Sequence, residues 1–271
     1  VPEYVEMVTR WCKTHTNMPV LVKLTPNVTS ILGPAGAAKA GGGDGVSLIN
    51  TVNSITSIDL DLMAPTPTVD GKGSHGGYCG PAVKPMALHM CAEIARNAGT
   101  AGLPMSAIGG ISNWRDAAEF IALGAGTTQV CTAVMHYGFK IVEDMIDGLS
   151  DWMDQKGYEK ISDFQGLAVP NITDWQNLNM NYEIVAEIEQ AKCVKCGLCH
   201  IVCEDTSHQA ISAERIDGER KYSVIDDECV GCNLCMHVCP ENCITMRKVD
   251  NGKDYMNWTQ DPRNPFSTAA E

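Results

Sequence analysis

Two cysteine runs constrain this chain more than any other feature of its sequence. The first is Cys193-x2-Cys196-x2-Cys199-x3-Cys203, and the second is Cys229-x2-Cys232-x2-Cys235-x3-Cys239, followed by Pro240. Three closely spaced thiolates on one turning loop can bind three irons of a cubane cluster. The fourth cysteine of each run then reaches the other cluster, as in bacterial two-cluster ferredoxins. The sequence therefore predicts two [4Fe–4S] clusters and a role in electron transfer.

Each predicted cluster takes ligands from both runs. Cluster one uses Cys193, Cys196, Cys199 and Cys239, and cluster two uses Cys229, Cys232, Cys235 and Cys203. Gly197 and Gly231 lie inside the loops, where the backbone must pass close to sulfide. The alternative is a pair of zinc knuckles, because Cys-x2-Cys also suits zinc, although zinc does not need a duplicated run. Cys243 falls outside the ligand pattern and is expected to be a small buried side chain.

The remaining cysteine usage indicates a reducing compartment. Nine of the 13 cysteines lie between Cys193 and Cys243 with the spacing of a metal site, and no secretory signal precedes them. The other four are expected to be reduced thiols: Cys12, Cys79, Cys91 and Cys131. No apolar stretch approaches the roughly 18–20 residues of a membrane helix. We expect a cytoplasmic protein with no membrane partner.

The charge of the chain is strongly negative and unevenly spread. The net charge is −13, with 12 acidic against 9 basic residues in 1–150 and 21 against 11 in 151–271. Such an acidic C-terminal half repels nucleic acid phosphates. It suits docking to a basic patch on a redox partner. An acidic surface that is only solvated and binds no partner is an equally simple interpretation.

Four short apolar strands alternate with helices in the first 150 residues, which predicts a parallel sheet covered by helices. The expected strands are 20–24, 45–50, 105–108 and 127–131, and the expected helices are 3–16, 29–40, 85–97, 113–123 and 137–154. An open doubly wound sheet and a β/α barrel both fit. A barrel needs eight units, so these would be its strands five to eight. The start at Val1, directly at a helix, also leads us to expect further sequence upstream.

Residues able to contact a ligand lie at the carboxyl end of each predicted strand, where β/α folds bind ligands. They are Lys23, Asn50-Thr51, Gly109-Gly110 and Cys131-Thr132. The last two pairs predict a phosphate site, because barrels often bind phosphate after their last two strands. The loop 51–85 is long for a βα connection, and its glycine-rich segment 75–80 could cover a cofactor. In that segment His75 could act as an acid or base and Cys79 as a nucleophile. We expect instead that His75 is solvated and Cys79 unreactive.

The domain organisation follows from these patterns. We expect the β/α part in 1–157, a connector in 158–187 with a short helix near 182–190, a ferredoxin-like domain in 188–249 and a polar tail in 250–271. Inside the third part, Asp217-Gly218 between two short β-prone runs predicts a hairpin.

The order of these motifs resembles the dihydropyrimidine dehydrogenase family, and within it the FMN and iron–sulfur subunit of bacterial NAD-dependent enzymes. The resemblance rests on motifs spread from residue 1 to about 249, which are Val22–Asn27, Asn50–Val52, Gly76-Gly77 with Pro85, Gly109–Ile111, Gln129–Ala133 and the two cysteine runs. It implies an α/β fold, the C-terminal half of a (β/α)8 flavin barrel fused to a two-[4Fe–4S] ferredoxin-like domain.

The resemblance also implies roles for individual residues. Lys23 would contact FMN, Gly77 would lie over it, and the phosphate would be held by Gly109, Gly110, Cys131 and Thr132. Asn50 and Thr51 would bind a pyrimidine, since an Asn side chain offers both a donor and an acceptor. The family's proton-donating cysteine lies on a loop upstream of the helix that begins this chain, so no catalytic residue is expected here.

The implied reaction is reduction of uracil or thymine to the 5,6-dihydropyrimidine. Electrons would pass from NADH through FAD on a partner subunit, then through the two clusters to FMN, in a hetero-oligomer. No Gly-x-Gly-x-x-Gly opens a helix after a strand, which agrees with a separate NAD-binding subunit. Two alternatives stay open, a dihydroorotate dehydrogenase relative and a ferredoxin-like carrier without flavin. A bare half barrel would expose sheet edges, so we expect it to be poorly stable alone.

Overall fold

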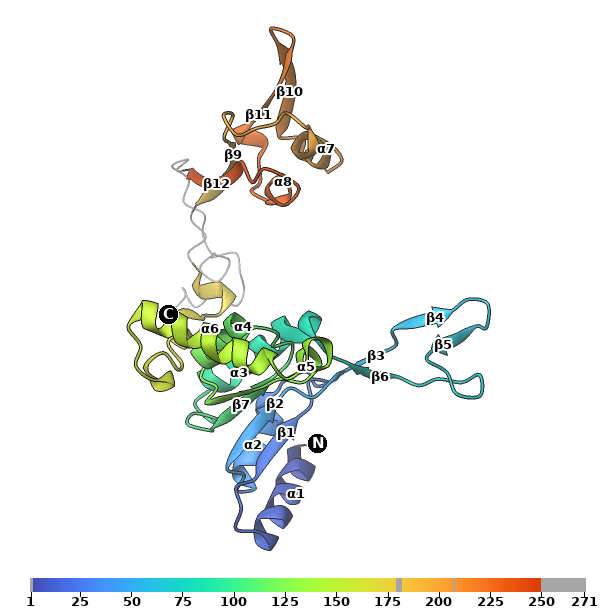
Figure 1. Cartoon of the computed structure of the whole chain (residues 1–271), viewed down its shortest axis with the longest axis vertical. Coiled ribbons are helices and arrows are strands. Elements are labelled where there is room, and N and C mark those ends of the chain that lie inside the picture. The colour runs from blue at the N-terminus through green and yellow to red at the C-terminus, as the bar shows by residue number, and fades with distance from the viewer. Residues whose placement is uncertain (1, 179–181, 207, 250–271) are drawn as a thin grey trace, which may run out of the picture. The chain divides into compact units, whose positions relative to one another are not determined.

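The computed structural model describes residues 2–178, 182–206 and 208–249, and divides into two compact units, Val1–Ile172 and Thr173–Glu271 (Figure 1). Each unit has its own buried core. The predicted tail 250–271 lies outside the described residues. Within the described ranges, no helix combines the length and apolar character required to cross a membrane.

The first unit is built on a parallel sheet of four strands, in the order β1-β2-β7-β8. The strands are β1 (Leu21–Leu24), β2 (Gly45–Leu48), β7 (Met105–Ile108) and β8 (Thr127–Gln129). Their carboxyl ends therefore meet along one edge of the sheet. The parallel sheet with covering helices that the sequence predicts is confirmed.

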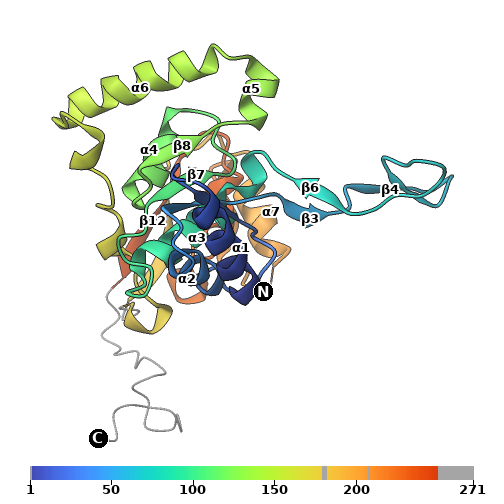
Figure 2. The ribbon, with the colours of Figure 1, turned by 90° about the horizontal axis from the view of Figure 1, so that it is seen from below.

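Four helices alternate with these strands: α1 (Pro2–His15), α2 (Leu32–Ala40), α3 (Lys84–Arg96) and α4 (Trp114–Ala122). Helices α2, α3 and α4 contact the sheet (Figure 2). Alanines such as Ala35 and Ala38, both fully buried, keep the contact surface of α2 small. Val46 and Leu48 are equally buried between sheet and helices, so one face of the sheet forms the core. Most of the stabilisation follows from this apolar burial.

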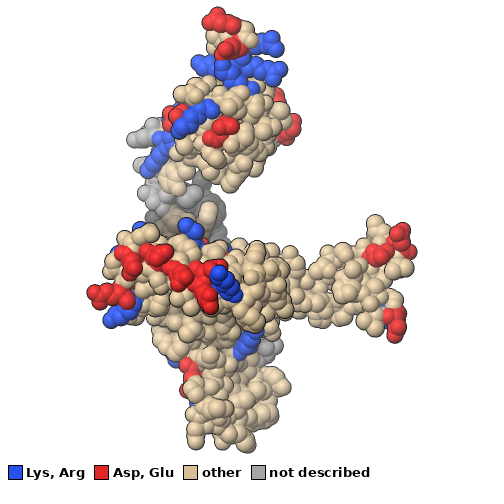
Figure 3. All heavy atoms as spheres, in the orientation of Figure 1, with Lys and Arg blue, Asp and Glu red and all other residues tan. Residues whose placement is uncertain are grey.

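The segment after β8 differs from the prediction of one helix over 137–154. It forms α5 (Thr132–Tyr137) and α6 (Ile141–Lys156), and Gly138 between them has a φ of 79°. A left-handed glycine ends a helix at little cost, which is why one helix becomes two. Acidic side chains gather along α6 (Figure 3).

Residues 158–172 were expected to be part of a connector, but they pack on the first unit. They include two short 3-10 turns, Ile161–Asp163 and Val169–Asn171. The side chain of Phe164 is buried in a cluster with Ala118 and Ile121 of α4.

The long connection after β2 forms an arm that projects from the sheet (Figures 1 and 2). At its base β3 (Val52–Ser54) pairs with β6 (Gly76–Tyr78), and further out β4 (Ser57–Asp59) pairs with β5 (Ala64–Thr66). The glycine-rich segment is thus a strand followed by the 3-10 turn Pro81–Val83, which leads into α3.

The second unit contains two antiparallel pairs, β9 (Glu183–Ile188) with β12 (Ile244–Val249) and β10 (Ile211–Ile216) with β11 (Glu219–Val224). The hairpin at Asp217-Gly218 lies where it was predicted. The prediction of a short helix near 182–190 was wrong, because this segment forms strand β9. Its β-branched residues favour a strand, and its partner lies about sixty residues further along the chain.

Three short helical elements complete this unit. They are α7 (Leu198–Glu204), α8 (Leu234–His237) and the 3-10 turn Asp226–Glu228. A further 3-10 turn, Trp175–Asn177, lies near its start. Helices α7 and α8 each begin inside a cysteine run, so each run turns from loop to helix at its third cysteine.

Candidate functional sites

A row of polar residues crosses the sheet of the first unit. Lys23 pairs in register with Ser47, Ser47 with Ser106, and Ser106 with Thr127. The residues on the two sides of this row, such as Val46 and Leu48, are buried in the apolar core. Because strand residues alternate between faces, the polar row lies on the face away from the helices.

Gln129 extends this row toward the carboxyl edge of the sheet. Its Nε2 donates hydrogen bonds to Ser47 Oγ and Ser106 Oγ, both at 2.8 Å. The Thr127 hydroxyl donates to Ser106 Oγ at 2.7 Å. Ser47 and Ser106 are only 6% and 5% exposed, so this network satisfies polar groups that would otherwise be costly to bury. It fixes the Gln129 side chain at the floor of a pocket.

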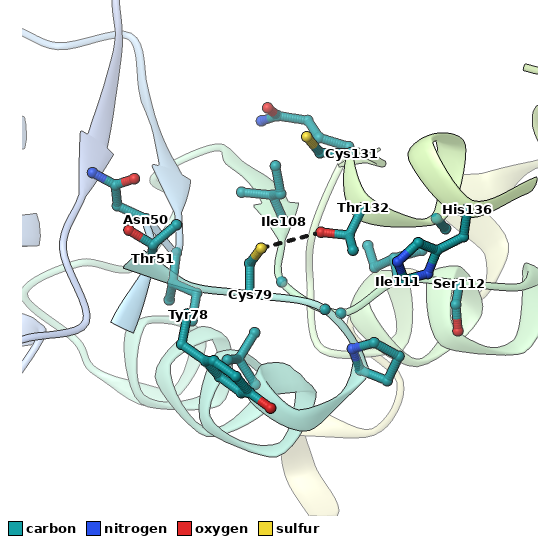
Figure 4. A pocket seen from close by; sticks show the side chains of 18 of the residues that line it. Asn50, Thr51, Tyr78, Cys79, Ile108, Ile111, Ser112, Cys131, Thr132 and His136 are labelled. Carbon is teal, nitrogen blue, oxygen red and sulfur yellow. Dashed lines mark hydrogen bonds between the residues drawn. The ribbon is translucent and has the colours of Figure 1, made fainter. Parts of the chain in front are cut away.

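The pocket lies at the carboxyl ends of all four strands and has a volume of about 830 Å³, including its open mouth (Figure 4). Its lining combines a lysine, amides and hydroxyls with apolar side chains. The residues that the sequence analysis selected are found among this lining: Lys23, Asn50, Thr51, Gly109, Gly110, Cys131 and Thr132.

Gly77 is the one predicted cofactor residue that the structure does not place in the pocket lining. It lies on β6 opposite Asn53, and a Cβ atom built on it would lie 2.2 Å from the hydroxyl oxygen of Thr51. Glycine is therefore required here so that β6 can pass against Thr51. His75 lines a separate, open hollow on the arm.

Asn27, just after β1, fixes the segment that carries Asn50 and Thr51. Its Nδ2 donates to the Thr51 carbonyl oxygen at 3.0 Å, and its Oδ1 accepts from the Asn53 backbone N–H at 2.9 Å. The Asn27 amide thus ties the end of one strand to the base of the arm. Asn27 closes the motif Val22–Asn27, and no role could be predicted for it from the sequence.

The Gly109-Gly110 turn packs tightly against the start of α3. Gly110 has a φ of 76°, and a Cβ on it would lie 2.7 Å from the Gly80 carbonyl oxygen and 2.9 Å from Lys84 Cβ. Only glycine allows this approach. The two backbone segments thus lie side by side at the wall of the pocket, where N–H groups could hold a phosphate.

An ion pair joins the start of α3 to α4 next to this turn. Lys84 Nζ lies 2.6 Å from Asp116 Oδ1 and 3.0 Å from Glu119 Oε2. Asp116 Oδ2 accepts from the Ser112 hydroxyl and backbone N–H, both at 2.8 Å. Burial opposes ionisation of Asp116, but the hydrogen bonds from Lys84 and Ser112 outweigh it and lower its pKa. The hydrogen bond to Asp116 raises the pKa of Lys84, so both groups are charged at neutral pH.

Sequence reasoning missed part of the pocket lining. Cys79 Sγ accepts a hydrogen bond from the Thr132 hydroxyl at 3.3 Å across the pocket (Figure 4). Other lining residues without a predicted role are Tyr78, Ser112, Gln129, His136 and Tyr137. Ser112 and Gln129 lie next to selected motifs and could have been found by extending them. His136 and Tyr137 lie on α5, whereas the helix expected from the sequence began only at residue 137.

The second unit holds two cavities that divide the eight predicted cysteine ligands between them. One is lined by Cys193, Cys196, Cys199 and Cys239, together with Cys243. The other is lined by Cys203, Cys229, Cys232 and Cys235. This division is the one expected when the last cysteine of each run crosses to the other cluster. Across the described ranges, no three His, Cys, Asp or Glu side chains converge as they would on a single metal ion.

The two runs have the same backbone path. The third residue of each, Lys195 and Gly231, and the fifth, Gly197 and Asn233, all have positive φ, between 59° and 83°. These left-handed residues give the two loops the same sharp turns between their first and third cysteines. Backbone N–H groups also lie against ligand sulfurs, from Ala186 to Cys229 Sγ at 3.4 Å and from Ala210 to Cys203 Sγ at 3.2 Å.

Burial shapes the chemistry of these thiols. It raises the pKa of Cys199 to about 11 and also raises the pKa of Cys235, the equivalent residue of the second run. Buried thiols resist ionisation unless a metal binds the thiolate. The four predicted ligand sulfurs at each cavity fit a cubane cluster, which would take up the thiolate charge and allow one-electron transfer.

Taken together, a polar pocket at the carboxyl edge of a parallel β/α sheet and two cavities of four cysteines define an iron–sulfur flavoprotein. Comparison with known families agrees with each part. The family described as dihydroorotate dehydrogenase matches residues 1–153, and the 4Fe-4S dicluster domain matches residues 186–246. The chain belongs to the dihydroorotate dehydrogenase family, with a two-cluster domain at its C-terminal side.

Individual relatives refine this placement. The NAD-dependent dihydropyrimidine dehydrogenase subunit PreA of Escherichia coli (strain K12) is 44% identical over 248 residues, which are 92% of this chain and 60% of that protein. The chloroplastic dihydropyrimidine dehydrogenase (NADP(+)) of Arabidopsis thaliana is 36% identical over 69% of this chain and 44% of that protein. The resemblance predicted from the sequence motifs is therefore confirmed.

A third relative covers less of the chain. The catalytic subunit of dihydroorotate dehydrogenase B (NAD(+)) from Pyrococcus horikoshii is 40% identical over 168 residues, 62% of this chain and 53% of that protein. The chain thus spans between 44% and 60% of the length of these curated relatives. The two [4Fe–4S] clusters and the flavin predicted from the sequence fit the matched families.

Proposed function

We propose that this chain is the FMN and iron–sulfur part of a dehydrogenase that reduces uracil or thymine to the 5,6-dihydropyrimidine. The electrons come from NADH through FAD on a partner subunit of a hetero-oligomer and pass through the two clusters to FMN. The observation that carries the proposal is that one chain has both a flavin-type pocket and two cavities of four cysteines. The 44% identity to a dihydropyrimidine dehydrogenase subunit extends across 92% of the chain and so includes both.

The residues at the strand ends would act on the pyrimidine and the flavin. The flavin, when bound, supplies hydride transfer, and the clusters supply single electrons. The Asn50 amide can donate to and accept from the amide and carbonyl edge of a pyrimidine, and Asn27 fixes the backbone next to it. Lys23 offers a positive charge in the same pocket.

The phosphate of FMN would bind on the other side of the pocket. Gly109 and Gly110 bring backbone N–H groups to its wall, and Thr132 adds a hydroxyl held toward Cys79. The Lys84–Asp116 ion pair keeps the Gly110 turn against the start of α3. No residue of this chain is proposed as the general acid.

Asn50→Ala, made in the full-length polypeptide assembled with its partner, tests the proposal. We expect iron and FMN content to stay unchanged and kcat/KM for uracil to fall at least tenfold, because a hydrogen-bonding group at a substrate edge is lost. Asn53→Ala on the arm is the matched control and should retain activity. An unmodified enzyme that contains no FMN, or that does not reduce uracil, would contradict the proposal.

Dihydroorotate oxidation is the alternative that the family name suggests. Orotate carries a carboxylate that needs a cation, and of the described residues that line the pocket only Lys23 is a lysine or arginine. That lysine is assigned to the flavin. The archaeal dihydroorotate relative also matches only 62% of the chain. Comparing uracil with orotate as substrates of the same preparation decides between the two, and faster turnover of orotate would overturn our proposal.

A further inference from the structure

Cys243 is a ninth cysteine that the ligand pattern does not use, yet it lies at cluster one. Its Sγ is 3.4 Å from the Sγ of Cys239, a predicted ligand, and its backbone N–H donates to the same sulfur at 3.4 Å. Cys243 is 3% exposed and lines the same cavity as the four predicted ligands of cluster one. A small buried side chain would satisfy packing alone, but an alanine would do so without placing a fifth sulfur in the cavity.

The chain path between the two cysteines brings the sulfurs together. Cys239 and Cys243 are joined by Pro240-Glu241-Asn242, and Asn242 has a φ of 48°. The Asn242 N–H donates to the Cys239 carbonyl oxygen at 3.3 Å. Proline and a left-handed asparagine both favour such a turn. The turn is anchored because the Cys243 carbonyl oxygen accepts from the Glu189 N–H at 2.8 Å.

We propose that Cys243 is a reserve ligand of cluster one, able to bind the iron that Cys239 binds when the Cys239 thiolate is lost. In this exchange the Fe–S bond to Cys239 breaks as the Cys239 thiolate takes up a proton, the Cys243 thiol releases its proton to solvent, and the Cys243 sulfur forms the new Fe–S bond, with no electron transferred. The sulfur needs to move by about the length that now separates the two, which is 3.4 Å. The inference rests on the two-cluster assignment, which the iron content of the unmodified chain tests separately.

The internal repeat of the domain supplies a matched control. Cys203 holds the position in the first run that Cys239 holds in the second, and the residue four positions after it is Ser207 rather than cysteine. The first run therefore has no cysteine at the position that Cys243 holds after the second run. Loss of Cys203 should cost a cluster, whereas loss of Cys239 should not.

Iron and acid-labile sulfide are measured in the full chain purified anaerobically. The unmodified chain, Cys243→Ala and Cys239→Ala should each hold about eight irons, and Cys203→Ala and the double variant Cys239→Ala/Cys243→Ala about four, since each cubane contains four. A Cys239→Ala chain with about four irons overturns the proposal. An unmodified chain without iron would instead refute the cluster assignment itself.

A second measurement keeps the proposal testable if Cys239→Ala fails to fold. The unmodified chain and Cys243→Ala, both with Cys239 intact, are exposed to air, and cluster loss is followed by absorbance and by the iron released. A reserve ligand retains a damaged cluster, so we expect the cluster-one phase to be several-fold faster in Cys243→Ala. Equal rates would show that Cys243 only fills space.

Discussion

At the scale of single residues, Gly231 offers a sharp test of how the second cysteine run is held. A Cβ atom built on Gly231 would lie 2.6 Å from the Ile184 carbonyl oxygen of β9, and its φ is 67°. The equivalent residue of the first run is Lys195, with a φ of 59°. Because Lys195 carries a side chain in this backbone conformation, the conformation alone does not require glycine. Gly231 must be glycine because its backbone lies so close to β9.

We therefore expect Gly231→Ala to displace the loop and lose cluster two, leaving about four of the eight irons. Gly218→Ala is the control, because Gly218 also has a positive φ, 85°, but nothing lies within 4 Å of its Cβ position. That variant should lose about 1–2 kcal/mol of stability from its left-handed backbone and keep its iron. Equal iron loss in both variants would assign the effect to backbone strain. Iron content and the temperature of iron release are the measurements.

At the scale of elements, the Lys84–Asp116 ion pair connects α3 and α4 next to the pocket. Replacing Lys84 by Met leaves the buried carboxylate of Asp116 without its cation, and we expect a loss of about 2 kcal/mol near neutral pH. The control is Lys160→Met, because Lys160 is 73% exposed and lies 3.9 Å from Asp163. It should cost little.

The pH dependence of this difference follows from the directions of the two pKa shifts. The pKa of Asp116 is lowered, so its stabilisation is present above the ordinary carboxyl range and is lost as the pH falls through the folded value. The pKa of Lys84 is raised, so its stabilisation is lost only as the pH rises above the ordinary lysine range. Urea unfolding gives the free energy of unfolding of the unmodified chain and of Lys84→Met. The difference between the two should be largest between about pH 5 and 9 and should shrink below pH 4. A difference in the free energy of unfolding that does not change with pH would mean that packing by the aliphatic part of the lysine side chain matters more than its charge.

The elements also show what could be predicted from sequence and why. The four parallel strands follow from continuous apolar runs, and the cysteine sets follow from spacing alone, because both signals are local. The arm over 52–78 was expected only as a long loop, since its pairs β3–β6 and β4–β5 depend on short polar segments without a clear period. Strand β9 was misjudged because its partner β12 is remote in the sequence.

The same distinction applies to the pocket. Lys23, Asn50 and Gly110 could be predicted as pocket residues because each lies at or just after the carboxyl end of a predicted strand. The network of Gln129 with Ser47 and Ser106 could not be found in this way, because it joins residues up to 82 positions apart across the sheet. Cys79 faces Thr132 only because β6 returns along β3 to the pocket.

At the scale of the whole molecule, the chain consists of two compact units with separate cores. The core of the second unit contains Ala186, Ile211, Tyr222 and Ile244 together with the buried cysteines Cys199, Cys235 and Cys243. All eight predicted cluster ligands belong to this unit. In small metalloproteins much of the folding free energy comes from the metal, so its stability should depend on iron more than on the first unit.

We therefore expect residues 173–271, produced without the first unit, to fold anaerobically with about eight irons and to unfold when a chelator or air removes them. Residues 1–172 are the control and should take up no iron, because the two four-cysteine cavities lie outside that unit. Circular dichroism with iron and sulfide analysis of each piece provides the test. If residues 173–271 held fewer than four irons while the full chain held eight, the first unit would be needed to assemble the clusters. The two units would then form one cooperative system, despite the separate cores seen in the structure.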